Sequence, residues 1–435
     1  MKILIAVLIF GILVLIHELG HFIFARINGI EVLDFSIGMG PRLCGFKAFG
    51  TQFSVRLLPI GGACMMLGED QDQNMDNERS FYAKNVWQRV SVLFAGPGFN
   101  FILAFVFSLF IIGSEGFDPA TVTKVTENGP AAVAGLQEGD VITKIGKSGV
   151  TFGRDIQSYF LYHEITEEPL KVTVERNGEK VKLTVLPEAY DKYMLGFTYS
   201  GADNGTAEIL ELSEGYPMEE AGLTVGDIIT KINDTEVSTG GELMAYFDRT
   251  PLTGEPIEVT FDRKGETVTT QVTPKYVSSD YSVGFAYNLA RVDTNAWETL
   301  KYSLAEVGFW IKDTARGLGK LFTGKVKSNE VGSVVAIVDL VGDTYEGSKD
   351  AGVKVTLLNL LSLSVWLSAN LGVMNLLPIP ALDGGKLLFC VIEIVRGKPV
   401  DREKEGMVHF IGMILLLLLM AFLIFNDVRN IFFAK

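Results

Sequence analysis

ILIAVLIFGILVLIHELGHFIF, residues 3–24, is an apolar run with one polar group, His17-Glu18-Leu19-Gly20-His21. If the run is a helix, side chains four residues apart share one face, about 6 Å apart along the axis. His17 and His21 are then placed to ligate one Zn²⁺, with Glu18 beside them as general base for a water molecule. Ionisable side chains inside a membrane are costly and functional as a rule, so we expect a metal site rather than the alternative, a polar contact between helices.

The length of this run predicts a membrane-spanning helix. Segments 90–112, 355–377 and 407–425 are also apolar enough and long enough to cross about 30 Å of hydrocarbon. The 435-residue chain is 48% hydrophobic, which fits a membrane protein with a soluble part. A cleaved signal peptide is the alternative for the first run, but no small-x-small cleavage site is evident, and cleavage would discard the motif. A metalloprotease motif in a retained span implies peptide-bond hydrolysis at or within the bilayer.

Charge is distributed unevenly along the chain. Between residues 114 and 295 there are 30 acidic and 15 basic residues, and the whole chain carries a formal net charge of −14. Such a segment repels phosphate backbones, so we expect no nucleic-acid partner. Lys and Arg cluster in the loops 26–89 and 396–404, which the positive-inside rule makes cytoplasmic. The acidic segment and both termini are then extracytoplasmic in a plasma (inner) membrane, and the histidine motif lies toward the cytoplasmic side.

The acidic segment contains an internal repeat. The pattern Ala-Gly-Leu-x-x-Gly-Asp-x-Ile begins at Ala134 and again at Ala221, 87 residues later, so each copy belongs to one small domain. Alternating stretches at 171–175 and 257–261 predict strands. The pattern resembles PDZ domains of bacterial envelope proteases, which implies two tandem modules able to take a peptide as an added strand. Spacers or a steric filter are the alternatives, and the segments 195–197 and 283–285 are either peptide-binding loops or ordinary strand ends.

Two further segments have recognisable patterns. Apolar residues at 297–322 recur at helical spacing opposite basic ones, which predicts an amphipathic helix on the membrane surface or on the protein's own core. Segment 52–68 is β-rich with a central Pro-Ile-Gly-Gly, which predicts a hairpin or bent strand at the membrane, able to pair with an unwound substrate. Gly38-Met39-Gly40-Pro41 is a second break and predicts a re-entrant loop.

Asp383 is the best candidate for the third ligand of a catalytic zinc, which usually keeps three protein ligands. It follows the third span at the predicted depth of the histidine motif. Pro378 and Pro380 forbid a regular helix there, and two glycines follow Asp383, which allows close approach. The alternative is a simple turn. His163 and His409 have no partner spacing and are predicted to be structural. Three cysteines without a CxxC pair predict neither a disulfide nor a cysteine zinc site.

These motifs together resemble the site-2 proteases, specifically the bacterial regulator-of-sigma-E protease type with PDZ domains. HELGH at 17–21 matches that family's first motif, and NLLPIPALDGG at 375–385 matches its second. Gly96-Pro97-Gly98-Phe99-Asn100 resembles a further element, in which Asn100 is predicted to serve helix packing. The resemblance implies zinc ligation by His17, His21 and Asp383 and catalysis by Glu18. It also implies that Asn375 holds the substrate or its oxyanion, for which an amide donor is suited; a helix-packing hydrogen bond is the alternative.

The expected fold is a multi-pass α-helical membrane protein with four transmembrane helices, a membrane-associated β-hairpin region and two inserted β-rich PDZ domains. The expected domains are an N-terminal membrane core (1–113), the first and second PDZ domains (114–200 and 201–290), an amphipathic helix with its connecting loop (291–354), and a C-terminal membrane core (355–435).

The expected function is a zinc-dependent intramembrane endopeptidase. By the resemblance, its substrates are single-span proteins trimmed outside by another protease, such as membrane anti-sigma factors, or signal-peptide remnants. The expected partners are these substrates and the lipid bilayer. One rival is a membrane-anchored PDZ adaptor with a structural or degenerate metal site. A zinc transporter or sensor is the other, and it would need polar residues along a path through the spans rather than one cluster.

Overall fold

The computed structural model describes residues 2–69, 77–200, 205–323 and 334–433. It divides into two compact units, one formed by Met1–Pro119 with Leu289–Lys435 and the other by Ala120–Asn288. We refer to them as the membrane unit and the β-rich unit. Residues 201–204, where the expected boundary between the two PDZ domains falls, and 324–333 of the expected connecting loop lie outside the described residues.

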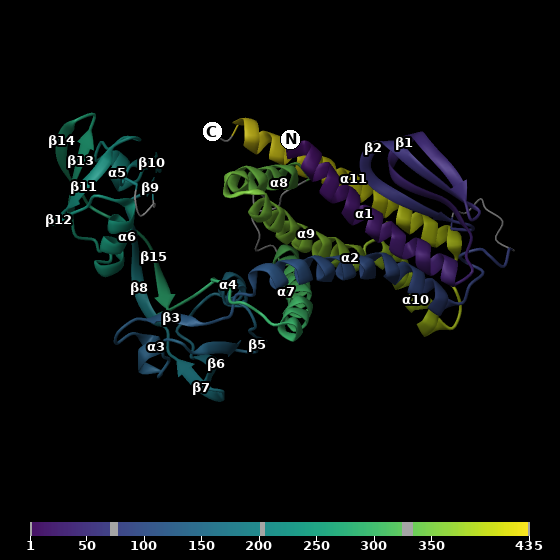
Figure 1. The fold of residues 1–435 in the computed structure, drawn as a ribbon, viewed down its shortest axis with the longest axis horizontal. Helices are drawn as coiled ribbons and strands as arrows, with labels where there is room; N and C mark the ends of the chain where they lie inside the picture. The colour runs from purple at the N-terminus through teal and green to yellow at the C-terminus, as the bar shows by residue number, and fades with distance from the viewer. Residues whose placement is uncertain (1, 70–76, 201–204, 324–333, 434–435) are drawn as a thin grey trace. The chain divides into compact units, whose positions relative to one another are not determined.

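The membrane unit is helical, and four of its helices are apolar and long enough to cross a membrane within the described ranges: Lys2–Ile27, Val86–Glu115, Val353–Leu376 and Arg402–Asn426. These are the four expected spans. α2 is the central helix, against which α1, α7, α9 and α10 pack (Figure 1). The helices of this unit are α1 (Lys2–Ile27), α2 (Val86–Glu115), α7 (Ala296–Phe322), α8 (Val334–Ser348), a 3₁₀ turn (Lys349–Ala351), α9 (Val353–Leu376), α10 (Asp383–Arg396) and α11 (Arg402–Phe433).

The amphipathic helix α7 packs partly on the protein's own core. Asn295 caps it by accepting hydrogen bonds from the backbone of Trp297 and Glu298, which fixes its start. Val307 is buried in a cluster contributed by α2 and α9, and Ile311 packs against the same cluster. Val307 and Ile311 thus pack on the protein's own core, whereas Trp297, Leu300 and Leu304 of the same apolar pattern are exposed. Both expected alternatives for 297–322 stay open.

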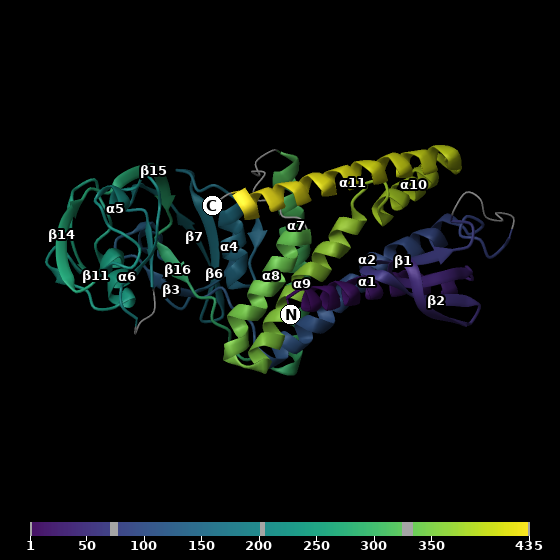
Figure 2. The ribbon, with the colours of Figure 1, turned by 90° about the horizontal axis from the view of Figure 1, so that it is seen from above.

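Two long antiparallel strands, β1 (Val32–Ala48) and β2 (Thr51–Met66), follow α1. Both bend, so that residues 32–37 pair with 62–66 on one side and with 52–55 on the other. Residues 42–48 pair with 51–56, which leaves 62–66 at an edge of the sheet. Segment 52–68 thus contains the expected bent strand. The break at 38–41 is a bend within β1 rather than a re-entrant loop, because Gly38 and Gly40 take positive φ without ending the strand pairing. Figure 2 shows the sheet at one end of α1 and α2.

The β-rich unit is built from the two sequence repeats. Each repeat forms a four-stranded sheet of the same order, β5-β4-β6-β7 in the first and β12-β11-β13-β14 in the second. The elements are β3 (Val122–Val125), α3 (Pro130–Val133), β4 (Val141–Ile145), β5 (Ser148–Gly149), α4 (Gly153–Tyr162), β6 (Leu170–Arg176), β7 (Glu179–Val185), β8 (Glu188–Met194), β9 (Phe197–Tyr199), β10 (Ile209–Leu212), α5 (Pro217–Glu220), β11 (Ile228–Ile232), β12 (Thr235–Glu236), α6 (Gly240–Arg249), β13 (Ile257–Arg263), β14 (Glu266–Val272), β15 (Lys275–Ser282) and β16 (Phe285–Tyr287).

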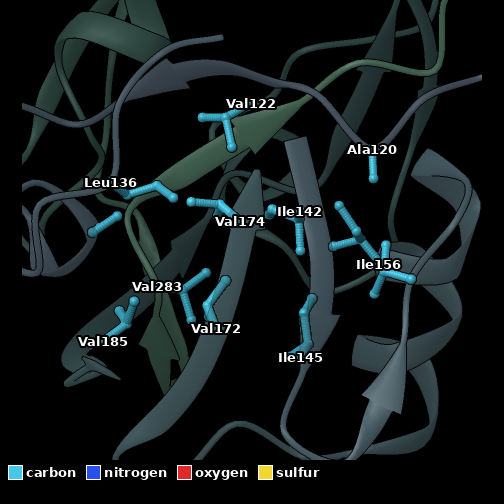
Figure 3. Close-up of a cluster of buried hydrophobic side chains, with 12 residues drawn as sticks. Ala120, Val122, Leu136, Ile142, Ile145, Ile156, Val172, Val174, Val185 and Val283 are labelled. Carbon is cyan, nitrogen blue, oxygen red and sulfur yellow. The ribbon is translucent and has the colours of Figure 1, made fainter. Parts of the chain in front are cut away.

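The second repeat is nested inside the first. β16 comes after the second repeat in sequence but pairs with β3 of the first, and Val283 joins the first repeat's buried core (Figure 3). β9 comes after the first repeat but pairs with β10 and packs in the core of the second. The linking strands β8 and β15 pair with each other. The expected division into 114–200 and 201–290 therefore differs from the structure, because strand pairing assigns β9 and β16 to the opposite repeats.

The aspartate of each repeat motif is held by an arginine 36 residues later. Arg263 donates to both carboxylate oxygens of Asp227, at 2.9 and 2.7 Å, and the backbone N–H of Thr224 donates to Oδ2. Asp140 has the same arrangement with Arg176. Burial alone would raise the pKa of Asp227, but the hydrogen bonds from Arg263 and Thr224 outweigh it and hold this pKa below its ordinary value. The shared Gly-Asp of the repeats thus fixes a turn and an ion pair.

Asp227→Asn is expected to lower the free energy of unfolding of the β-rich unit by about 1.5–3 kcal/mol at neutral pH, the typical contribution of hydrogen bonds to charged groups. Because the pKa is lower in the folded state, the carboxylate stabilises the fold fully above the unfolded pKa of about 4. This contribution is lost as the pH falls through the folded-state pKa. Urea unfolding followed by circular dichroism should separate parent and variant at neutral pH and bring them together in acid; a gap independent of pH would contradict the assignment.

Candidate metal centre

Helix α1 presents the two histidines of the sequence motif toward α2. The two helices approach closely because both carry glycine at the contact: a Cβ on Gly20 would lie 2.3 Å from the carbonyl oxygen of Ala95. Opposite the histidines, a Cβ on Gly96 would lie 2.3 Å from Nε2 of His21. The glycines of the HELGH and GPGFN motifs therefore leave the space in which the imidazoles meet.

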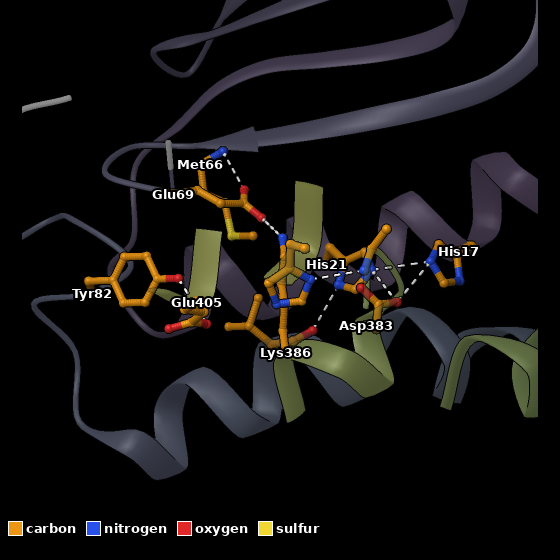
Figure 4. A network of polar contacts seen from close by, with 11 residues as sticks. His17, His21, Met66, Glu69, Tyr82, Asp383, Lys386 and Glu405 are labelled. Atoms are coloured by element: carbon orange, nitrogen blue, oxygen red, sulfur yellow. Dashed lines mark hydrogen bonds and ion pairs between the residues drawn. The ribbon is translucent and has the colours of Figure 1, made fainter. Parts of the chain in front are cut away.

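The structure brings His17, His21 and Asp383 together although Asp383 comes from the far end of the chain (Figure 4). Nε2 of His17 and Nε2 of His21 are 3.2 Å apart, and each lies 3.2 Å from Oδ2 of Asp383. The side chains of His17, His21 and Asp383 are only 10%, 8% and 16% exposed. Three atoms with lone pairs thus form an equilateral triangle in a mostly buried site, as a bound cation would require.

The dimensions of the triangle fit zinc. Four tetrahedral ligands at bond lengths of about 2.0 Å are separated from one another by roughly 3.3 Å, close to the 3.2 Å observed here. Two imidazole nitrogens and one carboxylate oxygen are also a ligand set of the kind that zinc takes in hydrolases, with one position left for water. The residues present therefore fit the metal that the sequence motif predicts.

The second nitrogen of each imidazole is also positioned. Nδ1 of His21 lies 2.9 Å from the carbonyl oxygen of Val92 and donates to it, so a neutral ring carries no proton on Nε2. Nδ1 of His17 lies 3.2 Å from the side-chain amide nitrogen of Asn100, whose Oδ1 is buried with no hydrogen-bond partner among the described residues. Flipping this amide, so that its oxygen and nitrogen exchange places, lets Oδ1 accept from Nδ1–H, and Nε2 of His17 is then also free for a metal.

Asn100 therefore does more than the helix packing that the sequence predicts for it. It is fully buried on α2, and it orients a candidate metal ligand in the way that outer hydrogen-bond partners commonly do. The available signal was its spacing: Asn100 follows Gly96 by four residues, so that both lie on the face of α2 that meets the histidines.

Asp383 is the first residue of α10, so Asp-Gly-Gly begins a helix here rather than forming an isolated turn. The two glycines let α10 start directly against the preceding chain, as the sequence predicts. A Cβ on Gly384 would lie 2.1 Å from the carbonyl oxygen of Leu377, and one on Gly385 would lie 2.4 Å from that of Ile379. The proline-containing segment 377–382 is thereby folded back against the helix that carries Asp383, the candidate third ligand.

A cavity of about 340 Å³ opens beside the triangle. Glu18 lines it next to the ligands, and Asn375, near the end of α9, lines it as well. The edge segment of β2 contributes residues 63–66 to the same wall. Gly62 lies against Glu18, because a Cβ there would be 3.0 Å from its Cγ. One cavity is thus lined by the candidate ligands, the candidate base, Asn375 and the edge of a strand.

Two ion pairs join α10 to neighbouring parts of the membrane unit. Lys386, one helical turn after Asp383, pairs with Glu69 just after β2, and both line the cavity (Figure 4). Arg89 of α2 is buried and pairs with Glu393 of α10 at 2.6 Å. Lys386 thus joins α10 to the segment after the sheet.

The remaining histidines and cysteines lie outside the triangle. His163 is exposed, stacks on Tyr159 and places its Nδ1 at hydrogen-bond distance from the carbonyl oxygen of that residue. His409 lies on α11, and Ala381 donates its backbone N–H to Nδ1 of this histidine. Cys44, Cys64 and Cys390 are free thiols. No second cluster of potential metal ligands occurs in the described ranges.

Spanning helices that enclose a His₂Asp triangle and a carboxylate beside it define a membrane-embedded metallopeptidase. The sequence model of peptidase family M50 matches residues 5–419, and the chain belongs to this family, as its resemblance to site-2 proteases predicts. A zinc metalloprotease RasP of Geobacillus kaustophilus is 30% identical over 98% of this chain and 97% of its own length. The regulator of sigma-W protease RasP of Bacillus subtilis is 29% identical over 98% of both chains. The protein is therefore an intramembrane zinc metalloprotease.

Proposed function

We propose that this protein cleaves the transmembrane segments of single-span membrane proteins after their ectodomains have been trimmed. The observation that carries the proposal is the convergence of His17, His21 and Asp383 beside Glu18, in a cavity between helices that are long and apolar enough to cross the membrane. A peptide bond that reaches this cavity meets the groups needed for hydrolysis at membrane depth. Anti-sigma factors and signal-peptide remnants are the proposed substrate classes.

The proposed roles follow from chemistry and placement. His17, His21 and Asp383 hold the zinc, which when bound supplies Lewis-acid activation of water and of the scissile carbonyl. Glu18 takes the proton from the attacking water and delivers it to the leaving amine. Asn375 offers its side-chain amide to the substrate or to the oxyanion that develops on the carbonyl oxygen.

The edge segment 62–66 of β2 is the proposed holder of an unwound substrate. A helical substrate shields its peptide bonds by internal hydrogen bonding, so it must become extended before hydrolysis. Segment 62–66 pairs with 32–37 on one side and, within the described ranges, with no strand on the other. Its residues 63–66 line the cavity, so a strand added along this edge passes beside Glu18.

The β-rich unit is proposed to comprise two PDZ domains on the extracytoplasmic side, with both chain termini on that same side. The repeated motif and the shared strand order of the two four-stranded sheets support this proposal. They admit substrates whose ectodomains have been trimmed, either by excluding bulk or by taking the new chain end as an added strand. The basic loops at 26–89 and 396–404 support a cytoplasmic position for the adjacent ends of the spans.

Removing the metal is expected to abolish cleavage. The full-length protein in proteoliposomes should cut a single-span peptide within its apolar segment, lose this activity after chelation, and regain it with stoichiometric zinc. Mass spectrometry of the products locates the cut, and the same peptide bearing a folded, untrimmed ectodomain is the matched control. Cleavage that survives complete removal of the metal, or cuts confined to the soluble part of the peptide, would contradict the proposal and favour an adaptor role.

A further inference from the structure

The segment that leads into Asp383 holds an unusual backbone conformation. Ala381 has φ of 78°, a region that non-glycine residues rarely occupy. It lies two residues before Asp383, so its φ and ψ help to determine the direction in which the carboxylate leaves the chain. A conformation of this kind persists only when the surroundings hold it.

His409 of α11 is hydrogen-bonded to this residue, Ala381. The backbone N–H of Ala381 donates to Nδ1 of His409 at 2.9 Å. Ala381 follows a proline and lines the cavity of the metal centre. This hydrogen bond lies at the exposed wall of the cavity, so its main effect is to fix the orientation of the peptide group before Ala381. The imidazole of His409 is therefore bonded to the same residue that holds the left-handed conformation.

Helix α11 is seated on this segment by a close contact as well. A Cβ on Gly412, three residues after His409, would lie 2.3 Å from Cβ of Pro380. From the other side, Gly384 and Gly385 bring α10 against residues 377–379. The segment is thus clamped between α10 and α11, and His409 contributes the polar contact of this clamp.

Packing alone does not explain a histidine here. Nδ1 must be unprotonated to accept from Ala381, so a neutral ring carries its proton on Nε2. That nitrogen is buried with no hydrogen-bond partner in the described part of the chain, which is a cost that an apolar side chain in a spanning helix would avoid. The acceptor at Nδ1 is therefore the feature that distinguishes histidine from leucine at this position.

We propose that His409 is a positioning residue for the metal centre: by fixing Ala381 in its left-handed conformation, it aims Asp383 at the two histidines. This rests on the proposed role of Asp383 as a zinc ligand. It also makes α11, the last span, a part of the metal site, although none of its described side chains belongs to the ligand triangle.

His409→Leu and His409→Asn separate positioning from packing. Leucine fills the space without an acceptor, whereas the amide oxygen of asparagine occupies nearly the place of Nδ1. The purified full-length protein is titrated with zinc against a competing chelator. Its Co²⁺-substituted form is compared by visible absorption, which reports the geometry of the ligands. The leucine variant is expected to bind zinc roughly 10–100-fold more weakly, the usual effect of losing an outer partner of a metal ligand, with an altered Co²⁺ spectrum. The asparagine variant should resemble the unchanged chain.

Two further variants make the outcomes distinguishable. Phe410→Leu alters an exposed neighbour on α11 and should change neither readout, and Asp383→Ala should lose the tight site altogether. If the leucine variant binds zinc as tightly as the unchanged chain while Asp383→Ala does not, positioning by His409 is refuted and the metal site stands. Positioning by His409 is also refuted if the asparagine and leucine variants bind zinc equally weakly. If Asp383→Ala binds zinc as tightly as the unchanged chain, Asp383 is not a zinc ligand. The inference about His409 is then refuted as well.

Discussion

Glu18→Gln is expected to lower the rate of cleavage of a single-span substrate by about 100- to 10,000-fold, the usual contribution of a positioned general base, while zinc remains bound. The amide has nearly the size of the carboxylate but cannot accept a proton from water at neutral pH. Glu18 lies beside the ligand triangle without belonging to it, so metal content should stay at the parent value. Single-turnover cleavage and metal analysis of the same preparation measure both quantities.

A matched control for Glu18 is Glu69→Gln. Glu69 lines the same cavity but is paired with Lys386, so its loss removes a negative charge without removing the base. Its effect on the rate of cleavage should be far smaller. Equal losses in the two variants would mean that the charge of the cavity, and not proton transfer by Glu18, limits the reaction. A Glu18→Gln variant with undiminished cleavage would refute the proposed mechanism outright.

Gly96→Ala is expected to disrupt the metal centre from outside the ligand set. Its added methyl group would lie 2.3 Å from Nε2 of His21 and 2.9 Å from Cε1 of His17, so one or both imidazoles must leave the triangle. Zinc affinity should fall by roughly 10–100-fold or more, as when a partner that orients a ligand is lost, and cleavage should fall with it. Chelator competition measures the affinity, and gel filtration in detergent reports whether the variant remains folded.

Gly98→Ala, two residues further along α2, is the control for this substitution. A methyl group there meets only the ring of Phe94 at an ordinary contact distance of 3.6 Å, while helix propensity changes in the same way as at Gly96. This variant should retain zinc and activity. If both alanine variants lost zinc equally, a general distortion of α2 around Pro97 would explain the result, and the steric role of Gly96 would be wrong.

The sequence was sufficient for the parts of the site that depend on local spacing. A histidine pair four residues apart in an apolar helix predicts one face and one cation, and the four spans follow from length and hydropathy. The approach of Asp383 to the two histidines was predictable because two prolines and two glycines mark a place where a helix must stop and a close approach becomes possible. The structure brings these residues together as those patterns predict.

Other features depend on contacts between distant segments and carry no local signal. Strand pairing decides the exchange of β9 and β16 between the two repeats. β16, for example, pairs with β3, which lies at the opposite end of the β-rich unit's sequence. The repeat pattern alone divides the segment in the middle. The polar contact of Asn100 with His17 required α1 and α2 to be placed side by side. The bend at 38–41 was predicted as a loop because glycine and proline end strands more often than they redirect them.

The two chain segments that join the β-rich unit to the membrane unit lie side by side. Phe117 and Val292, just outside the β-rich unit, bridge each other as antiparallel partners. The chain therefore leaves and re-enters the membrane unit at points about one strand spacing apart, roughly 5 Å. The two ends of the inserted segment are therefore close enough for a short turn to join them. The β-rich unit is therefore an insertion between two neighbouring points of the membrane unit, and every residue of the candidate metal centre lies in the membrane unit.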